Sequence, residues 1–490
     1  MAEEFVVGLD LGTTNVKAIL FTTYGKVVFA AEQTIQTFYS QDHGATQNPE
    51  EVEQAARLTL KKVVQECKKM QGKIVAVGFS AAMHTLLFVD ARLRPLANML
   101  IWSDGRSQEQ VKELLAKHGH AIYERTGTPI HPMNPLVKLD WLKRIGAVAY
   151  KDAHFVMTMK DYLVAKWFGV RYIDYSMASS MGLFNIHTYD WDEEALVLAG
   201  IDRKQLSELV PPTYVLPKIK LEVAEELGIH VDTPFVIGSA DGQLANLGSG
   251  AIHEGEVAIT VGTSGAVRQF VSDVSLSSDQ STFCYAFTKK KKIIGGPTNN
   301  GGVVLQWLKD VLGFQDSFEQ FLQLADSVPV GAEGILFLPY VNGERAPLWN
   351  QHAKGTFFGL NITHKKEQIV RAVLEGITFN LFQIASELQK QGSNHEKIYV
   401  SGGLARSTIW LKMLADIFGK EIYRTGTPQT SAWGAAWTAL VAIEKVSRFE
   451  EIKNYQKVQE IIAPDHNNHA LYMERYELFK RVGNDLKKYY

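Results

Sequence analysis

The sequence of 490 residues has little cysteine and no excess of charge of either sign. Its two cysteines, Cys67 and Cys284, lie far apart, which argues against a disulfide scaffold and against a cysteine-rich zinc site. Lysine and arginine number 51 and aspartate and glutamate 53, a formal net charge of −2. The chain therefore offers no overall basic field to nucleic acid or to an anionic membrane.

Apolar residues are spread along the chain and are not gathered into one long run. They make up 46% of the sequence, which is enough for a sizeable buried core. No apolar run approaches the roughly 18 residues of a membrane-spanning helix, and residues 1–4 are acidic where a secretion signal is basic. These features predict a soluble, cytoplasmic protein that binds neither nucleic acid nor membrane.

The first half begins with strand signals. Short apolar runs at residues 5–9, 16–21 and 27–35 are separated by turn residues, which is typical of antiparallel strands joined by tight turns. Asn48 and Pro49 then suit the cap and the first position of a helix, on which Cys67 would be a core residue. A buried strand is expected at residues 74–79.

The second half repeats the opening pattern. Residues 257–267 again read as an apolar strand, a Gly-Thr-Ser turn and a second apolar strand. A helix is expected at about 365–389, a strand at 397–400, and a further helix that begins near residue 401 and ends near 419. This repeat favours two related α/β domains, 1–246 and 247–490, with a cleft between them. The last helix could pack back on the first domain, and Gly248, Gly250 and Gly255 are candidates for a hinge.

The turn after the first strand has the composition of an anion-binding site. A glycine and short hydroxyl or amide side chains leave backbone N–H groups uncovered, and such groups cradle phosphate. Asp10, at the tip of the strand, is placed to hold hydrated Mg²⁺, although the segment alone could also be an ordinary hairpin turn. The candidate residues are Asp10, Gly12, Thr13, Thr14, Asn15 and Lys17.

Two further glycine segments lie in the second half. Gly262 and Thr263 form a turn that could hold the same polyphosphate from the other side of the cleft. Gly402 and Gly403, between a strand and a helix, would let a flat ring approach the backbone closely. A Walker-type loop is excluded because the sequence has no GxxxxGK[ST], and the GxGxxG order of a dinucleotide fold is absent from the first turn.

The sequence resembles the FGGY family of carbohydrate kinases over essentially its whole length. The three glycine segments resemble that family's two phosphate motifs and its adenosine motif, and residues 133–142 and 355–360 resemble its two signatures. The resemblance implies an α/β fold of two duplicated actin-like, ribonuclease-H-like ATPase domains, an N-terminal sugar-binding and a C-terminal nucleotide-binding one. It also implies ATP and Mg²⁺ as cofactors, and it adds Gly302, Gln306 and Ser407 as nucleotide contacts.

A kinase of this type needs a base for the acceptor hydroxyl. Asp241 follows an apolar strand and is the predicted catalytic base and acceptor contact, with a turn-forming Asp-Gly as the alternative. Met83 and His84 resemble the family's sugar-binding position, although core packing would also explain them. Asp104 and Arg106 are further candidates for polyol contacts, and an Asp–Arg pair that stabilises a turn is the equally weighted alternative.

Within the family, residues 126–133 and 175–182 resemble the gluconate kinases, which implies phosphorylation of D-gluconate to 6-phosphogluconate. The alternatives are a xylulose kinase with the same mechanism and, from another class, an actin-like nucleotide-switch ATPase. The expected partner is a small sugar or sugar acid, and a homodimer is left open. The candidates for binding a substrate carboxylate are Arg106, His131, Lys138 and Lys160.

Two positions depart from the family pattern. Lys17 stands where arginine is common, and Gly242 follows Asp241 where an amide residue is often found. The second departure removes one sugar ligand. Residues 343–349 also match the family, but the sequence assigns them no physical role.

Overall fold

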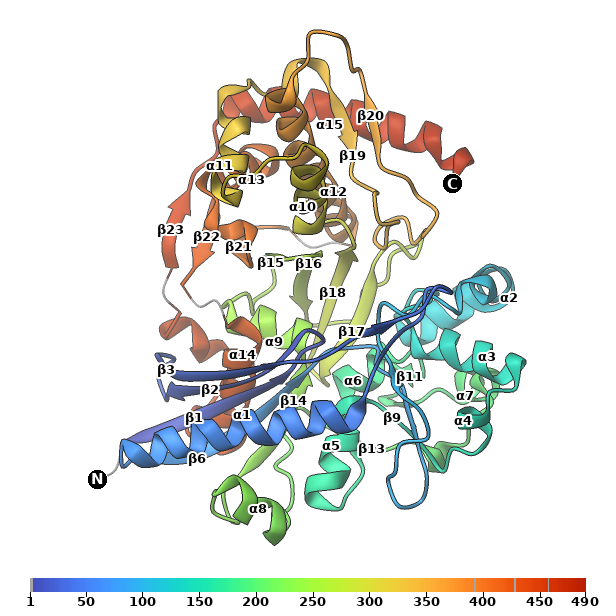
Figure 1. Ribbon diagram of the computed structural model, residues 1–490, viewed down its shortest axis with the longest axis vertical. Coiled ribbons are helices and arrows are strands. Elements are labelled where there is room, and N and C mark those ends of the chain that lie inside the picture. The colour runs from blue at the N-terminus through green and yellow to red at the C-terminus, as the bar shows by residue number, and fades with distance from the viewer. Residues whose placement is uncertain (1–2, 392–393, 427–428, 457) are drawn as a thin grey trace.

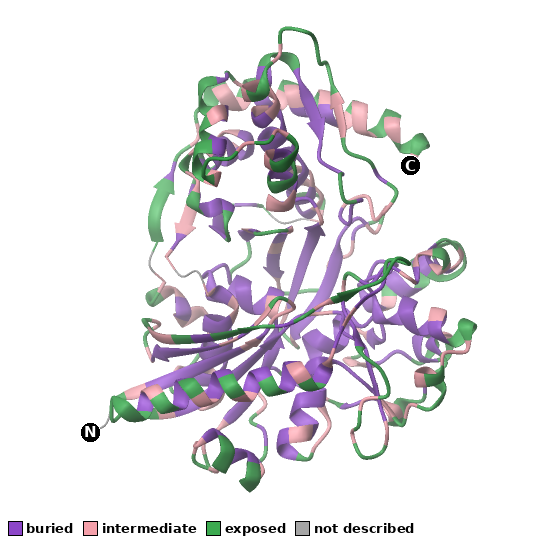
Figure 2. Ribbon diagram, viewed as in Figure 1, coloured by how far each residue is buried: buried purple, intermediate pink, exposed green. Residues whose placement is uncertain are grey.

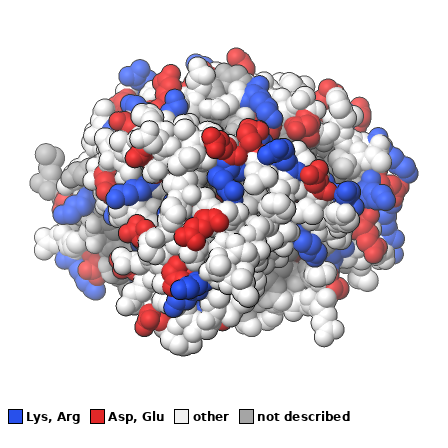
Figure 3. Space-filling view, turned by 90° about the horizontal axis from the view of Figure 1, so that it is seen from above, with Lys and Arg blue, Asp and Glu red and all other residues white. Residues whose placement is uncertain are grey.

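The computed structural model describes residues 3–391, 394–426, 429–456 and 458–490. Figure 1 shows two lobes, each built around a sheet, with the N-terminal lobe in blue to green below and most of the C-terminal lobe in yellow to red above. In Figure 3, which views the molecule from above, acidic and basic side chains are interspersed, as the nearly balanced composition predicts.

The first sheet consists of β1 (Glu4–Leu11), β2 (Asn15–Thr22), β3 (Val27–Thr34), β6 (Lys73–Ala81) and β14 (Phe235–Ala240). Their order across the sheet is β14-β6-β1-β2-β3. The β1–β2 and β2–β3 pairs are antiparallel, whereas β1–β6 and β6–β14 are parallel. The predicted antiparallel strands at the start of the chain are therefore confirmed.

The second sheet repeats this arrangement. It consists of β15 (Glu256–Val261), β16 (Gly265–Val271), β17 (Phe283–Thr288), β18 (Lys291–Thr298), β21 (Lys397–Ser401), β22 (Ile422–Thr425) and β23 (Val458–Ile462). Their order is β17-β18-β16-β15-β21-β22-β23. As in the first sheet, the leading strand β15 pairs antiparallel with β16 and parallel with β21, which continues parallel to β22.

The remaining elements connect or cover the two sheets. In the first half they are β4 (Phe38–Tyr39), β5 (Ala45–Gln47), α1 (Pro49–Lys69), β7 (Leu87–Val89), β8 (Met99–Leu100), α2 (Gln108–Thr126), α3 (Pro135–Ile145), α4 (Val148–Lys151), β9 (Phe155–Met157), α5 (Met159–Phe168), β10 (Tyr172–Asp174), α6 (Tyr175–Ser180), β11 (Phe184–Asn185), β12 (Asp190–Trp191), α7 (Glu193–Ala199), η1 (Arg203–Gln205), β13 (Glu208–Val210), α8 (Leu221–Leu227) and α9 (Asp241–Gly248). In the second half they are α10 (Gly302–Val311), α11 (Phe318–Gln323), η2 (Leu324–Ser327), η3 (Ala332–Gly334), β19 (Leu336–Leu338), β20 (Thr356–Phe358), α12 (Lys366–Lys390), η4 (Leu404–Arg406), α13 (Thr408–Phe418), α14 (Thr430–Ala442), η5 (Phe449–Asn454), α15 (His466–Leu486) and η6 (Lys487–Tyr489).

Helix α1 begins where the sequence predicts. The Asn48 side chain accepts a hydrogen bond from the Glu50 N–H, and Pro49 takes the first helical position. Cys67, near its end, is buried in the first core, as predicted. By contrast, the helix expected to begin at residue 401 begins at Thr408, after a short 3₁₀ turn, because the Ser407 side chain caps it.

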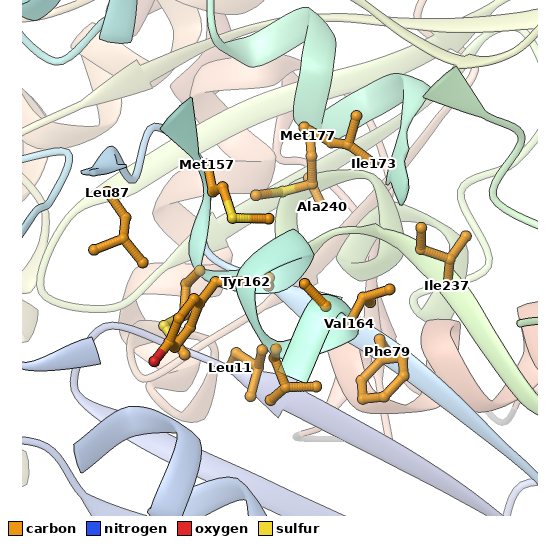
Figure 4. Close-up of a cluster of buried hydrophobic side chains, with 14 of the residues drawn as sticks. Leu11, Phe79, Leu87, Met157, Tyr162, Val164, Ile173, Met177, Ile237 and Ala240 are labelled. Atoms are coloured by element: carbon orange, nitrogen blue, oxygen red, sulfur yellow. The ribbon is translucent and has the colours of Figure 1, made fainter. Parts of the chain in front are cut away.

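Each half has a buried core of its own. In Figure 2 the strands of both sheets are mostly buried. Figure 4 shows part of the first core, in which Leu11 of β1 and Phe79 of β6 lie near Tyr162 and Val164 of α5. In the second half, α12 is the one described helix long and apolar enough to cross a membrane. Because 72% of its most apolar window is buried inside the molecule, α12 is a core helix of the second half.

Helix α14 comes from the second half but packs on the first sheet. A Cβ atom added to Gly8 of β1 would lie 2.0 Å from the Ala432 carbonyl oxygen, and one on Gly78 of β6 would lie 2.0 Å from that of Ala435. Both strands therefore need glycine so that the helix can approach the sheet. This contact builds a third core between the halves, which includes Trp433 and Trp437.

A helix that returns to the first half is therefore α14, which precedes the last helix of the chain. The final helix, α15, packs on α13 and β19 within the second half, and the expectation that it also contacts the first domain stays a prediction. Its buried side chains Tyr472, Tyr476 and Phe479 belong to the second core, so its apolar face is already satisfied there. The predicted boundary between residues 246 and 247 falls inside α9 and stays a prediction.

Candidate active site

A pocket of about 870 Å³ lies between the two halves and brings most of the predicted site residues together. From the first half it is lined by the turn after β1, by the loop after β6 and by the start of α9. From the second half it is lined by the turn between β15 and β16. The predicted residues in its lining are Asp10, Gly12, Thr13, Thr14, Asn15, Lys17, Met83, His84, Asp241, Gly262 and Thr263.

The first turn places a carboxylate and an ammonium side by side. Asp10 pairs with Lys17 across β1 and β2, and the Ser80 hydroxyl donates a 2.6 Å hydrogen bond to Asp10 Oδ1. Burial raises the pKa of Asp10 above its usual value, and the Ser80 hydrogen bond and the Lys17 charge oppose that rise. Gly12 allows the tight turn, because a Cβ there would lie 2.8 Å from the Asn15 carbonyl oxygen.

The second turn is anchored to the start of α10. The Gly302 N–H donates to the Gly262 carbonyl at 2.8 Å, and the Val303 N–H donates to the Thr263 carbonyl at 3.1 Å. A Cβ on Gly302 would lie only 2.8 Å from the Gly262 oxygen, so this junction requires glycine. The turn is held by backbone hydrogen bonds and presents no charged side chain of its own.

A second pocket, of about 460 Å³, continues from Gly262 into the second half. Gly302, Gly403 and Ser407 line it, together with apolar side chains that include Leu322 and Leu404. Gly402 stands outside this lining, and its φ of 96° and its close approach to the Val261 carbonyl let the chain turn at the end of β21. A glycine-walled, partly apolar pocket beside a phosphate turn has the form needed for the ring of a nucleotide.

Gln306, like Gly402, is a predicted nucleotide contact that lines neither of these two pockets. Its amide lies one turn along α10 and donates to Asp310 Oδ1 at 2.8 Å on the exposed side of the helix. The amide is therefore occupied within its own helix, and its role as a contact stays a prediction.

Asp241 is the first residue of α9, directly after the buried strand β14, and its carboxylate lines the central pocket. Burial, and next the negative charge of Asp10, raise its pKa to about 6. Arg268, the Gly242 N–H and Lys160 oppose this rise. A carboxylate with a pKa near 6 is ionised at neutral pH yet basic enough to take a proton from a hydroxyl as bonds form.

Met83 and His84 follow β6 and line the same pocket. His84 has a φ of 63°, and its Nδ1 lies 2.8 Å from the Ser180 carbonyl, which makes Nδ1 the protonated nitrogen. Burial and then the charge of Lys138 lower its pKa to about 3, so the ring is neutral. Its Nε2 is therefore an acceptor suited to a hydroxyl.

Asp104 and Arg106 form the turn-stabilising pair that was the alternative to direct contact. Asp104 is buried, accepts from the Ala45 N–H at 2.9 Å and from Arg106 Nη2 at 2.7 Å, and stands outside the pocket lining. Arg106 stacks on the Trp141 ring at 5.1 Å and lines a neighbouring groove.

The other cations proposed for a substrate carboxylate have partners within the protein, and their role in binding stays a prediction. Lys138 Nζ is buried and donates to the carbonyls of Ile101 and Met133, at 2.6 and 3.0 Å. Lys160 forms a buried ion pair with Asp174 at 2.5 Å. His131 accepts from the Met133 N–H and lies against Trp349, in the neighbouring groove and not in the central pocket.

Two arginines that sequence reasoning missed line the central pocket, Arg268 on β16 and Arg345. Arg345 lies in the segment 343–349, where the buried Glu344 carboxylate accepts from Thr298 at 2.7 Å and from Asn380 at 2.8 Å and so fixes the loop. Arg268 carries the one charge in an otherwise uncharged strand, Gly265–Val271, and that isolated charge was the signal available in the sequence.

The pocket suits a magnesium ion that is shared with phosphate. The described residues contain no group of three or more His, Cys, Asp or Glu side chains that could hold a metal on their own. Asp10 and Asp241 are the carboxylates in the described lining. Mg²⁺ characteristically binds through one or two carboxylates with water and substrate phosphates, and the donor set fits that pattern.

Comparison with known proteins places this geometry in a family. The model of the FGGY family of carbohydrate kinases, N-terminal domain, matches residues 5–248, and that of the C-terminal domain matches residues 257–443. The chain belongs to this family. The predicted family and its fold are thereby confirmed.

Relatives with known names are similar over nearly the whole chain. The gluconokinase of Bacillus licheniformis is 38% identical over 99% of this chain and 97% of its own length. The gluconokinase of Bacillus subtilis is 39% identical, over 92% of this chain and 90% of its own. A xylulose kinase of Staphylococcus epidermidis is 29% identical over 100% of this chain and 98% of its own.

Two solved structures from Lactobacillus acidophilus match equally well. One is described as a ligand-bound xylulose kinase and the other as a gluconate kinase. Each has a TM-score of 0.95 and 32% identity, and the match covers 99% of this chain and 98% of the other. These structures support the fold and do not separate the two acceptors.

Proposed function

We propose that this protein transfers the γ-phosphate of ATP to the C6 hydroxyl of D-gluconate, with Asp241 as the general base. The observation that carries the acceptor is the identity of 38–39% to two gluconokinases, against 29% to a xylulose kinase over a similar span. A cytoplasmic location is part of this proposal.

In this proposal the second pocket holds the ring of ATP, and the central pocket holds its phosphates and the acceptor. The ring of ATP fits the pocket at Gly403, and its phosphates run past Gly262 to the two turns, whose N–H groups cradle them. Asp10 would hold Mg²⁺, which supplies positive charge for the β- and γ-phosphates. The acceptor then lies beyond the phosphates, beside His84 and Asp241.

Asp241 orients the acceptor hydroxyl and takes its proton as the new O–P bond forms. Phosphoryl transfer depends chiefly on positioning and charge stabilisation, so an ordinary carboxylate suffices. Losing a positioned general base typically lowers the rate by about 10² to 10⁴.

The test is ADP release with ATP and Mg²⁺ against D-gluconate, xylulose, ribulose, glycerol and no acceptor, repeated with Asp241→Asn. We expect rapid turnover with gluconate and a loss of at least about a hundredfold in the variant. Asp190→Asn, a surface carboxylate paired with Arg203, is the matched control and should change nothing. Faster turnover with xylulose would favour the xylulose kinase alternative, and ATP binding without acceptor-dependent turnover would favour a nucleotide switch.

A further inference from the structure

The space beside Gly242 is filled by an arginine from the other half of the molecule. A Cβ atom placed on Gly242 would lie 3.0 Å from Nε and 3.3 Å from Cζ of Arg268, and 3.1 Å from Cε of Met83. Gly242 is the second residue of α9, whereas Arg268 lies on β16 of the second sheet. The absent side chain at 242 is what makes room for this guanidinium.

Arg268 lines the pocket and has an unused hydrogen-bond donor. Its Nε is buried and has no hydrogen-bond partner in the described part of the chain. The charge of Asp241 acts on the pKa of Arg268, yet no ion pair between the two side chains is found among the described residues. The guanidinium is thus held in the pocket without a salt bridge of its own.

Arg345 presents a second guanidinium to the same pocket. One of its terminal nitrogens donates to the Thr298 carbonyl at 3.0 Å, and its guanidinium lies over the Trp102 ring at 4.8 Å. Its Nε, too, is buried without a partner among the described residues. Burial lowers the pKa of Arg345 to about 10; the negative charge of Glu344 opposes that fall, and the like charge of Arg268 adds to it.

The charge balance of the pocket leaves room for an anion at the acceptor end. Its lining holds Lys17, Arg268 and Arg345, against the carboxylates of Asp10 and Asp241. Asp10 is opposite Lys17 in the first turn. Two guanidiniums with unused donors are suited to a carboxylate, which accepts paired N–H bonds from arginine.

We propose that Arg268 determines acceptor specificity: with Arg345 it binds the carboxylate of an acyclic sugar acid, and Gly242 leaves the space it needs. This assignment rests on the proposed function, because it names the group of gluconate that these residues recognise. It also explains the departure at 242, since the amide side chain expected there is replaced by a guanidinium from across the cleft.

The test compares two acceptors that differ at the recognised group. D-gluconate carries a carboxylate at C1, and D-glucitol carries a hydroxyl there. For Arg268→Gln we expect kcat/KM for gluconate to fall about 30- to 100-fold, mainly through KM, while kcat/KM for glucitol changes less than about threefold. Arg268→Lys should retain part of the preference. Arg203→Gln, on the surface, is the matched control.

Gly242→Asn gives an independent test of the space argument. Its side chain would displace Arg268, so gluconate affinity measured by calorimetry should fall at least about tenfold. Combined with Arg268→Gln it should cause little further loss, because the two changes remove the same contact. Thermal unfolding and the KM for ATP report whether each variant is folded.

Three results would overturn the assignment. Equal losses with gluconate and glucitol would mean that Arg268 acts on the transferred phosphoryl group, and unchanged gluconate kinetics would remove it from recognition altogether. Wild-type protein that neither binds nor phosphorylates gluconate would refute the proposed function first and the assignment with it.

Discussion

The two turns that face each other across the pocket share a backbone plan but differ in charge. At the end of β1, Asp10 lies opposite Ser80 of the neighbouring parallel strand. At the end of β15, Thr260 lies opposite Ser401 in the same relation. Both serines contact their partner, through a 2.6 Å hydrogen bond to Asp10 and a 3.1 Å contact with the Thr260 hydroxyl.

The difference continues across the antiparallel neighbour. Asp10 pairs with Lys17 in the first sheet, and Thr260 pairs with the uncharged Ala266 in the second. Asp241, the other carboxylate of the described lining, also comes from the first half. The duplicated fold thus supplies two turns that we propose as phosphate cradles. The first half carries the acids proposed to hold the metal and take the proton, whereas the second turn has no charged side chain, which would avoid repelling a polyphosphate.

Removing the acid from the first turn should have the largest effect on activity. Asp10→Asn keeps the shape but loses the negative charge proposed to hold Mg²⁺, so we expect kcat to fall at least about a hundredfold. ADP release measured over a range of Mg²⁺ concentrations checks this. Thr260→Val, at the matching position, should cost less than about tenfold, and equal losses in both variants would contradict the division of roles.

In contrast to the two turns, the helices α9 and α14, which follow the last parallel strand of each sheet, are alike in the two halves. A Cβ on Gly248 of α9 would lie 1.9 Å from the Thr430 carbonyl, and one on Gly434 of α14 would lie 2.1 Å from that of Leu244. Each helix therefore uses a glycine against the backbone of the other. Gly248, a hinge candidate in the sequence, is required for this close packing.

Alanine at either glycine should destabilise the protein to a similar degree. We expect Gly248→Ala and Gly434→Ala each to lower the free energy of unfolding by about 1–3 kcal/mol through overpacking, measured by thermal or urea unfolding. Gly483→Ala in α15, where the nearest atom to an added Cβ is 3.9 Å away, is the control and should be neutral or stabilising. A large effect at only one of the paired glycines would show that the helix contact is not reciprocal.

Adding an acid to the second turn should sharpen the comparison. Thr260→Asp places a carboxylate at the position that Asp10 occupies in the first half, but without a cation opposite it. Repulsion of the ATP phosphates should raise the KM for ATP about tenfold, while Thr260→Asn, of similar size and neutral, should have a smaller effect. Steady-state kinetics with varied ATP distinguishes the two, and equal KM values would remove charge as the cause.

The sequence predicted the parts of this site that depend on local pattern. The two turns have short polar residues after apolar strands, and Asp241 also follows an apolar strand. The sequence therefore showed both the type of each residue and its position at the end of a strand. Arg268 and Arg345 could not be placed in this way, because packing across the cleft brings them into the central pocket. Likewise the place of α14 on the first sheet depends on Gly8 and Gly78, whose need for close approach is tertiary.

The sequence left two roles open for one pair of residues, polyol contact and stabilisation of a turn. Asp104 and Arg106 have the chemistry of polyol ligands, yet they satisfy each other in a turn. The sequence could not decide between these roles, because it does not show whether a carboxylate is exposed or paired with a neighbouring arginine.

The smallest effect that we predict is a shift in pH dependence, and it tests whether the first turn acts on the base. Protonated Asp241 cannot accept a proton, so kcat/KM should fall as the pH drops through its pKa of about 6. The charge of Asp10 helps to raise that pKa and the charge of Arg268 lowers it. The acid limb, which is the part of the pH profile where kcat/KM falls with decreasing pH, should therefore shift to lower pH in Asp10→Asn and to higher pH in Arg268→Gln. Each shift should be about half a pH unit to one pH unit. Thr260→Asn carries no change of charge and should leave the limb in place, so a shift in that variant would mean that the limb does not report the charge around Asp241.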